Sequence, residues 1–88
     1  MNGQTVGHLR SDDVVLMARC TYRQLSYWSS LGYLWPERVH PGEMHGSGNA
    51  FRWSLTETAV AVRMASLVNL FGMRPTVAAR LARDGWPS

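Results

Sequence analysis

The stretch Thr21–Leu34, TYRQLSYWSSLGYL, constrains the fold of this chain most, because it carries both the start and the stop signal of one short helix. Thr21 is a good N-cap, and Gln24 three positions later completes a capping box, in which each side chain accepts a hydrogen bond from the other residue's backbone amide. Gly32 supplies the stop, because glycine readily adopts the left-handed conformation that ends helices. The stretch therefore predicts a helix from Tyr22 to Leu31.

The side chains of this predicted helix sort onto two faces at helical spacing. The apolar face is expected to pack on the core and comprises Leu25, Trp28 and Leu31. The polar face is free to contact a partner and comprises Tyr22, Arg23, Ser26, Tyr27 and Ser30. An ordinary amphipathic helix with a solvated polar side has the same periodicity, so the pattern alone leaves both interpretations open.

Arginine and hydroxyl groups on such a face suit contacts with DNA. The guanidinium group makes bidentate hydrogen bonds to guanine, so Arg23 is the best candidate for contact with a base edge. Hydroxyl groups donate to phosphate oxygens, so the remaining polar residues are candidates for backbone contacts. They are Thr21, Tyr22, Ser26, Tyr27 and Ser30.

Residues 19–34 resemble the N-terminal DNA-binding domain of the MerR family, whose core usually reads G-V-S-P-R-T-L-R-Y-Y-E-R-E-G-L-L. The two align over sixteen positions without a gap, and the run T-Y-R-Q-L-x-Y-W matches one branch of the family still better. Arg19 replaces a turn glycine, and Ser26 replaces an arginine that in the family commonly contacts the DNA backbone. The resemblance implies a winged helix-turn-helix domain that binds double-stranded DNA.

A proline- and glycine-rich segment follows, in which a helix is excluded. Short extended pieces around Arg38 to His40 and Ala50 to Trp53 predict a β-hairpin, which in a winged helix is the wing. MerR proteins have a G-x-R-x-Y-S element here, and residues 49–54 read N-A-F-R-W-S, with the arginine displaced by one position.

Two arginines of this hairpin are candidates for contacts with phosphate or a narrow minor groove, Arg38 and Arg52. Phe51 occupies the position of the family's wing arginine, and neighbouring strand residues point to opposite faces. Arg52 therefore does not simply inherit that arginine's role. The alternative interpretation is that both are solvated arginines on a loop.

The remaining sequence predicts three more helices. Ser11 begins the first, where Asp12 and Asp13 suit the positive end of the helix dipole. A second capping-box pattern, Ser54 with Glu57, opens a long helix. Its expected range is Leu55 to Phe71, with Val60, Met64, Leu67, Val68 and Phe71 on the buried side. Gly72 ends it, and Pro75 begins a last helix whose inner face is expected to hold Val77, Ala78, Leu81 and Ala82 before Gly85.

With 88 residues the chain makes one small domain. We expect it to be mainly α-helical, with about four helices and a small β-hairpin wing. The expected organisation is a flexible N-terminal arm over residues 1–10, a winged helix-turn-helix domain over 11–85 and a short tail over 86–88. We expect the domain to stand alone, without the dimerisation helix or ligand-sensing domain of complete MerR regulators.

Charge and composition limit the function classes. The nine basic residues are all arginine, and the net charge of +3 favours a polyanionic partner. No apolar run approaches the roughly 18 residues needed to span a bilayer, and no secretory signal is visible. We therefore expect a cytoplasmic, nucleoid-associated protein. Cys20 is the only cysteine, which excludes an internal disulfide, and we expect it to serve as a small structural residue.

Nothing in the sequence indicates catalysis or a bound cofactor. The chain shows no nucleophile with a suitable base, no paired carboxylates at a workable spacing and no phosphate-binding glycine loop. His40, Glu43 and His45 form H-x-x-E-x-H, but they lie on a single proline-rich loop, which is a weak basis for a metal site. We expect no enzymatic activity, no cofactor, no metal and no small-molecule effector.

Three functions remain open. The preferred one is a small transcriptional regulator that binds specific sites in double-stranded DNA, helped by a second copy on an adjacent site or by another DNA-bound protein. The first alternative is an excisionase of the phage type, which bends DNA at tandem sites. The second alternative is a protein-interaction module on the same scaffold, with Tyr33, Trp35 and Trp86 as anchors.

Overall fold

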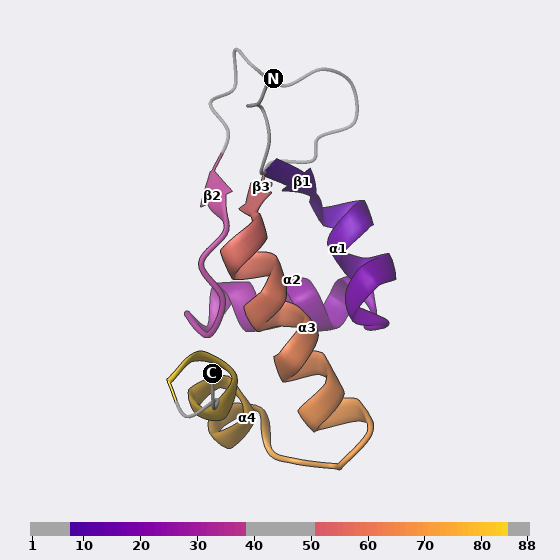
Figure 1. Cartoon of the computed structure of the whole chain (residues 1–88), viewed down its shortest axis with the longest axis vertical. Helices are drawn as coiled ribbons and strands as arrows, with labels where there is room; N and C mark the ends of the chain where they lie inside the picture. The colour runs from indigo at the N-terminus through magenta and orange to yellow at the C-terminus, as the bar shows by residue number, and fades with distance from the viewer. Residues whose placement is uncertain (1–7, 39–50, 85–88) are drawn as a thin grey trace.

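The computed structural model describes residues 8–38 and 51–84, which form four helices and a three-stranded sheet (Figure 1). In chain order the elements are β1 (His8–Arg10), α1 (Ser11–Ala18), α2 (Tyr22–Ser30), β2 (Glu37–Arg38), β3 (Phe51–Ser54), α3 (Leu55–Asn69) and α4 (Pro75–Arg83). The prediction of a mainly α-helical chain with a small β element is confirmed for these residues. None of their helices is long and apolar enough to cross a membrane.

The sheet is antiparallel and has the order β1-β3-β2. The predicted extended pieces overlap β2 and β3, while residues 39–50, between them, lie outside the described part. The expectation of a flexible arm is wrong for its last three residues, because His8–Arg10 form β1. A strand of three residues is too short to show an alternating pattern, and this one depends on pairing with β3, far along the chain.

The inner face of the sheet joins the helical core. Leu9 pairs with Trp53 in register, and Trp53 is only 1% exposed. Its ring N–H donates to the hydroxyl of Ser11 at 3.0 Å, which links β3 to the first residue of α1. A buried indole normally needs such a partner, so this bond fixes the junction between sheet and helix.

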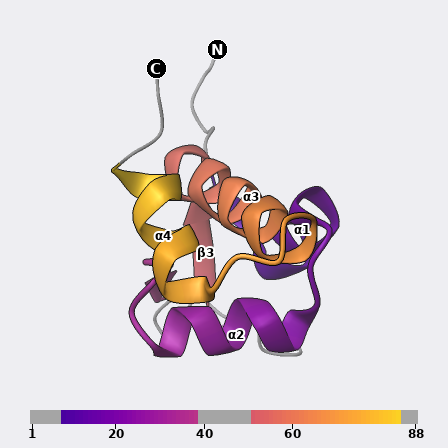
Figure 2. The same ribbon diagram turned by 90° about the horizontal axis from the view of Figure 1, so that it is seen from below.

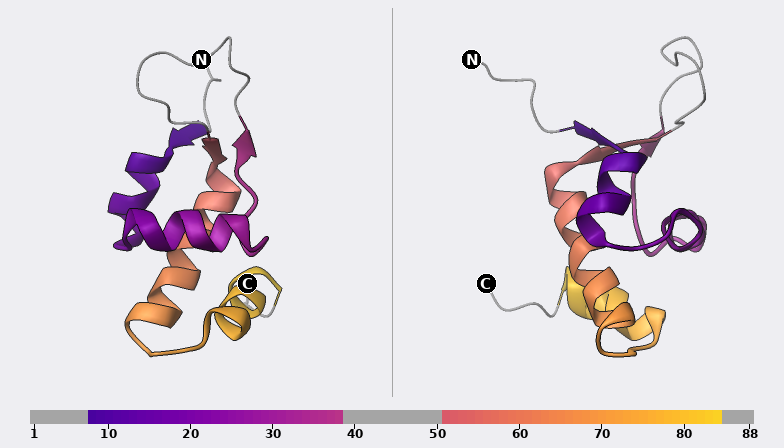
Figure 3. Two further views of the ribbon diagram at one scale, coloured as in Figure 1. Left: turned by 180° about the vertical axis from the view of Figure 1, so that it is seen from behind. Right: turned by 90° about the vertical axis from the view of Figure 1, so that its right-hand side faces the viewer.

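The helix α3 runs through the middle of the molecule, and α1 and α4 pack against it (Figure 1). Viewed from below, α2 lies along one side of the molecule, with α1, α3 and α4 on the other (Figure 2). The view from behind shows α2 crossing in front of α3 (Figure 3). One side of α2 therefore packs on the core and the other faces outward. The buried hydrophobic residues are Val14, Ala18, Leu25, Trp28, Leu34, Trp53, Val60, Ala61, Met64, Ala65, Ala78, Ala79 and Ala82.

The predicted signals at the ends of α2 are confirmed. The Thr21 hydroxyl accepts from the Gln24 backbone N–H at 3.0 Å, and the Gln24 side chain accepts from the Thr21 N–H at 3.2 Å. Gly32 follows the helix with φ of +86°. Arg19, in the turn between α1 and α2, has a left-handed φ of +56°, the conformation that a glycine would adopt without strain.

Four residues expected in the core are exposed instead: Leu31, Phe71, Val77 and Leu81. Leu31 and Phe71 lie just beyond the last turns of α2 and α3, where helical periodicity no longer sets their direction. The helix α4 packs on α3 through small side chains, Ala78 and Ala82, which bring the two helices close. Its larger side chains are therefore left at the edge of the contact.

Candidate nucleic-acid interface

The outward face of α2 carries the predicted polar residues. Tyr22, Arg23, Ser26, Tyr27 and Ser30 are all exposed. The side chains of Arg23, Ser26 and Tyr27 make no hydrogen bond or ion pair within residues 8–38 and 51–84. Their donors are therefore available to a partner at no cost to the fold.

An open groove lies between this face of α2 and the β2–β3 strand pair. Arg23, Tyr27 and Ser30 line it from α2, and Arg38 and Phe51 line it from the sheet. Arg38 pairs with Phe51 across the strands, and its guanidinium lies 5.3 Å from the centre of the phenyl ring. Such a cation–π contact directs the side chain while leaving its charge available. The groove thus holds two arginines, Arg23 and Arg38, that have no acidic partner in the described part of the chain.

Arg52 lies outside this groove. It follows Phe51 in β3 and therefore points to the opposite face of the sheet. There its Nε lies 3.6 Å from a carboxylate oxygen of Glu37, which also lies 3.6 Å from His8. The structure therefore brings Arg38, but not Arg52, together with the face of α2.

The hydroxyl groups near α2 differ in availability. The Thr21 oxygen already accepts the capping bond from Gln24. The Ser30 hydroxyl donates to the Tyr27 carbonyl at 2.9 Å, so it must give up this bond before it donates to a phosphate. Ser26 and Tyr27 are thus the better placed of the predicted phosphate contacts.

Tyr22 has an acidic neighbour that sequence reasoning missed. Burial, and after it the charge and hydrogen bond of Asp12, raise the pKa of Tyr22. Asp12 stands in the first turn of α1, so the fold places a carboxylate beside the start of α2. A carboxylate at this position repels a phosphate and lowers the positive potential around the first turn of α2.

If this face binds duplex DNA, we expect Asp12→Asn to bind it roughly twofold to fivefold more tightly at low salt, because the repulsion is removed. Asp84→Asn is the matched control, since it changes the net charge equally at the end of α4, outside the groove. Titration of a labelled duplex with each variant measures the effect. Equal gains for both variants would show that only net charge matters.

Gln24 also ties α2 to the end of α3. Its amide nitrogen donates to Asn69 Oδ1 at 2.9 Å, and the Asn69 amide donates back to the Gln24 oxygen at 3.2 Å. The same side chain thus caps α2 and orients it. The capping role could be read from the spacing to Thr21, whereas the partner 45 positions away had no local signal.

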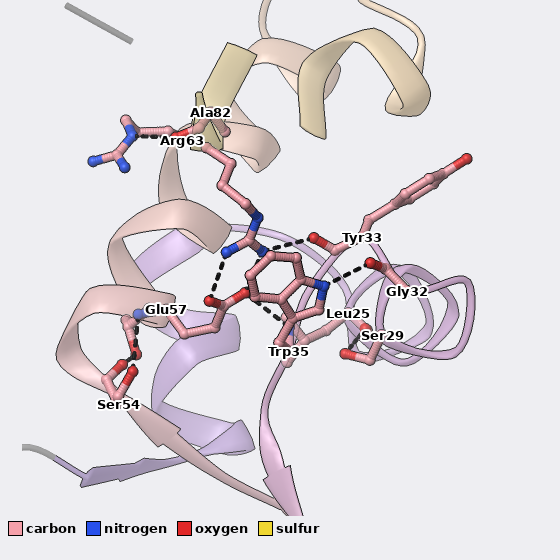
Figure 4. A network of polar contacts seen from close by, with 11 residues as sticks. Leu25, Ser29, Gly32, Tyr33, Trp35, Ser54, Glu57, Arg63 and Ala82 are labelled. Carbon is pink, nitrogen blue, oxygen red and sulfur yellow. Dashed lines mark hydrogen bonds and ion pairs between the residues drawn. The ribbon is translucent and has the colours of Figure 1, made fainter. Parts of the chain in front are cut away.

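A second polar network joins α3 and α4 to the segment that leaves α2 (Figure 4). Arg83 donates to both carboxylate oxygens of Glu57, at 3.0 and 2.6 Å, and to the Tyr33 carbonyl at 2.9 Å. Its guanidinium also stacks on Trp35, 3.4 Å from the ring centre. Bidentate geometry with little exposure makes this a strong ion pair.

The capping box predicted for α3 is therefore only half correct. The Ser54 hydroxyl accepts from the Glu57 backbone N–H at 3.0 Å, as expected. The Glu57 carboxylate does not return to Ser54, because it is bound by Arg83 and by the backbone N–H of Trp35. The sequence already places Glu57 on the side of α3 that faces the core. An acidic residue on such a side indicates a buried cationic partner.

Cys20 is partly buried against the core, and burial raises the pKa of its thiol. A raised pKa lowers the thiolate fraction and with it the reactivity. Within the described ranges, no group of three or more metal-binding side chains comes together. The H-x-x-E-x-H residues at 40–45 lie outside these ranges.

No protein-family model matches the chain, and a search of curated proteins finds no match.

Proposed function

We propose that this chain is a double-stranded DNA-binding protein with a winged helix-turn-helix fold of the MerR type. The observation that carries the proposal is the groove in which the exposed face of α2 and Arg38 meet. A helix that exposes Arg23, Ser26 and Tyr27 fits the major groove. A flanking strand pair whose Arg38 has no acidic partner in the described residues fits the adjacent backbone. The net charge of +3 and the resemblance of residues 19–34 support the same conclusion.

In this mechanism α2 enters the major groove. Arg23 contacts a base edge or anchors beside it, while Tyr27 and Ser26 contact the backbone. Arg38 contacts the flanking phosphate from the base of the wing. Trp28 and Leu25, both 2% exposed, hold α2 on the core from its other side.

We expect Arg23→Ala to weaken specific DNA binding by about 1 to 3 kcal/mol, roughly fivefold to 150-fold, without loss of fold. The target is first selected from a random duplex pool, and its affinity is then measured at two salt concentrations. Circular dichroism checks that the variant is folded.

Arg80→Ala is the matched control for Arg23→Ala. It removes the same charge from an exposed site on α4 that does not line the groove. We expect it to weaken binding by no more than about twofold, through the general field of the protein. If the folded Arg23→Ala variant had the same affinity as the Arg80→Ala variant, the proposed role of α2 in the major groove would be refuted.

The process that we propose is regulation of transcription from specific sites. The excisionase alternative requires several adjacent sites and a bent duplex, which a circular-permutation gel shift detects. The interaction-module alternative requires a folded chain that binds no duplex even at low salt. Of its predicted anchors, Trp35 is exposed, Tyr33 is partly buried against the core, and Trp86 lies outside the described residues.

A further inference from the structure

Trp35 is exposed and yet held in place. The residue is 62% exposed, although its ring N–H donates to the Gly32 carbonyl at 2.8 Å. Its backbone N–H donates to Glu57 at 2.8 Å, and Arg83 stacks on its ring. Burial of an indole is strongly favourable, so a ring that is fixed but left uncovered indicates a contact surface.

The position of Trp35 connects it to the groove. It lies between the end of α2 and the start of β2 and lines the groove with Tyr27 and Arg38. It also lines a shallow hollow against α4, which contains Arg83. Arg83 lines this hollow and not the groove, so it occupies one side of the ring and leaves the groove side open.

We propose that Trp35 packs its open face against the deoxyribose of the DNA strand that runs through the groove, and that Arg83 is the positioning residue that holds the ring there. The inference rests on the proposed function and names one further contact for it. A strand in this groove presents phosphates, which match Arg23 and Arg38, and between them sugars with apolar faces. Trp35 lines the same groove as these two arginines, so its flat ring can meet a sugar beside the phosphates that they bind.

The sugar is the better partner than a base. The faces of bases in a duplex are covered by their neighbours, and an indole reaches one only after the base is flipped out of the stack. The sugars lie on the outside, where an exposed ring meets them without any distortion of the DNA. Trp35 therefore adds affinity rather than sequence preference.

The first test measures affinity for the selected duplex by anisotropy of a labelled strand. We expect Trp35→Ala to bind about tenfold more weakly, from the lost apolar contact, and Trp35→Phe, which keeps a flat ring, within about twofold of the wild type. Phe71→Ala is the matched control, because Phe71 is 73% exposed and does not line the groove. It should bind like the wild type.

Tryptophan emission gives a second readout that does not depend on the alanine variant. The chain has four tryptophans, so the titration is made in a Trp86→Phe background. Trp28 and Trp53 are buried, so contact with DNA should then change the emission of Trp35 most. We expect the change seen on titration of this background with duplex to be largely lost when Trp35→Phe is added, although the protein still binds. A change of the same size in Trp35→Phe would overturn the proposed contact.

The role of Arg83 is tested by its coupling to the ring. Lysine keeps the charge but lacks the planar group that stacks on an indole. Arg83→Lys should weaken binding about threefold in the wild type and add no further loss in the Trp35→Ala background. Additive losses would show that Arg83 does not act through Trp35.

The outcomes separate this inference from the proposed function. If Arg23→Ala weakens binding while folded Trp35→Ala does not, the sugar contact is wrong and the proposed function stands. Equal losses for Trp35→Ala and Phe71→Ala would also overturn the contact. A wild-type chain that binds no duplex would overturn both proposals.

Discussion

Alanine in place of Trp28 is expected to lower the free energy of unfolding by about 3 to 5 kcal/mol, because it removes a large buried side chain from the centre of the core. Trp28 is 2% exposed and lies in one buried cluster with Leu25 and Leu34. Domains of this size are stable by about 5 to 15 kcal/mol, so the loss is a large part of the total. Urea unfolding followed by far-ultraviolet circular dichroism measures it without depending on tryptophan emission.

Leu31→Ala is the control for the Trp28 variant. Leu31 lies three positions later and was expected on the same buried face, but it is 47% exposed. We expect its replacement to cost less than about 1 kcal/mol. Equal losses of stability for the two variants would show that Leu31 packs in the core and would overturn this orientation of α2.

The helix α2 could be predicted almost to the residue because its signals are local. Thr21, Gln24 and Gly32 act on neighbouring backbone groups, and the spacing of Leu25 and Trp28 sets the buried face. The same reasoning found α3, α4 and the exposed polar residues that line the groove. The prediction that Leu31 and Phe71 are buried was wrong, because it continued the helical period beyond the last residue of each helix.

The contacts that orient these elements could not be predicted, since each depends on a partner far along the chain. Residues 8–10 become a strand only because β3 lies beside them. Gln24 finds Asn69 after 45 residues, and Glu57 finds Arg83 after 26. The capping-box spacing alone paired Glu57 with Ser54, its nearest partner. A single sequence does not show which distant cation competes for that carboxylate.

The network around Glu57 leads to the second large effect. We expect Glu57→Ala to lower the free energy of unfolding by about 3 to 5 kcal/mol, because it leaves a poorly exposed guanidinium without its carboxylate. The Trp35 N–H also loses its acceptor. Urea unfolding measures the loss, and Glu57→Gln, which keeps an acceptor oxygen but not the charge, should lie between wild type and alanine.

Glu37→Ala is the matched control for the Glu57 variant. The Glu37 side chain is 59% exposed and lies 3.6 Å from Arg52, so its removal should cost no more than about 1 kcal/mol. Losses of the same size at the two glutamates would show that the Arg83 pair is as weak as a surface pair. The two sites differ further in what they hold together. Glu57 joins α3, α4 and the segment that enters β2, so its loss should also speed amide hydrogen exchange at Trp35, whereas Glu37→Ala should leave that amide protected.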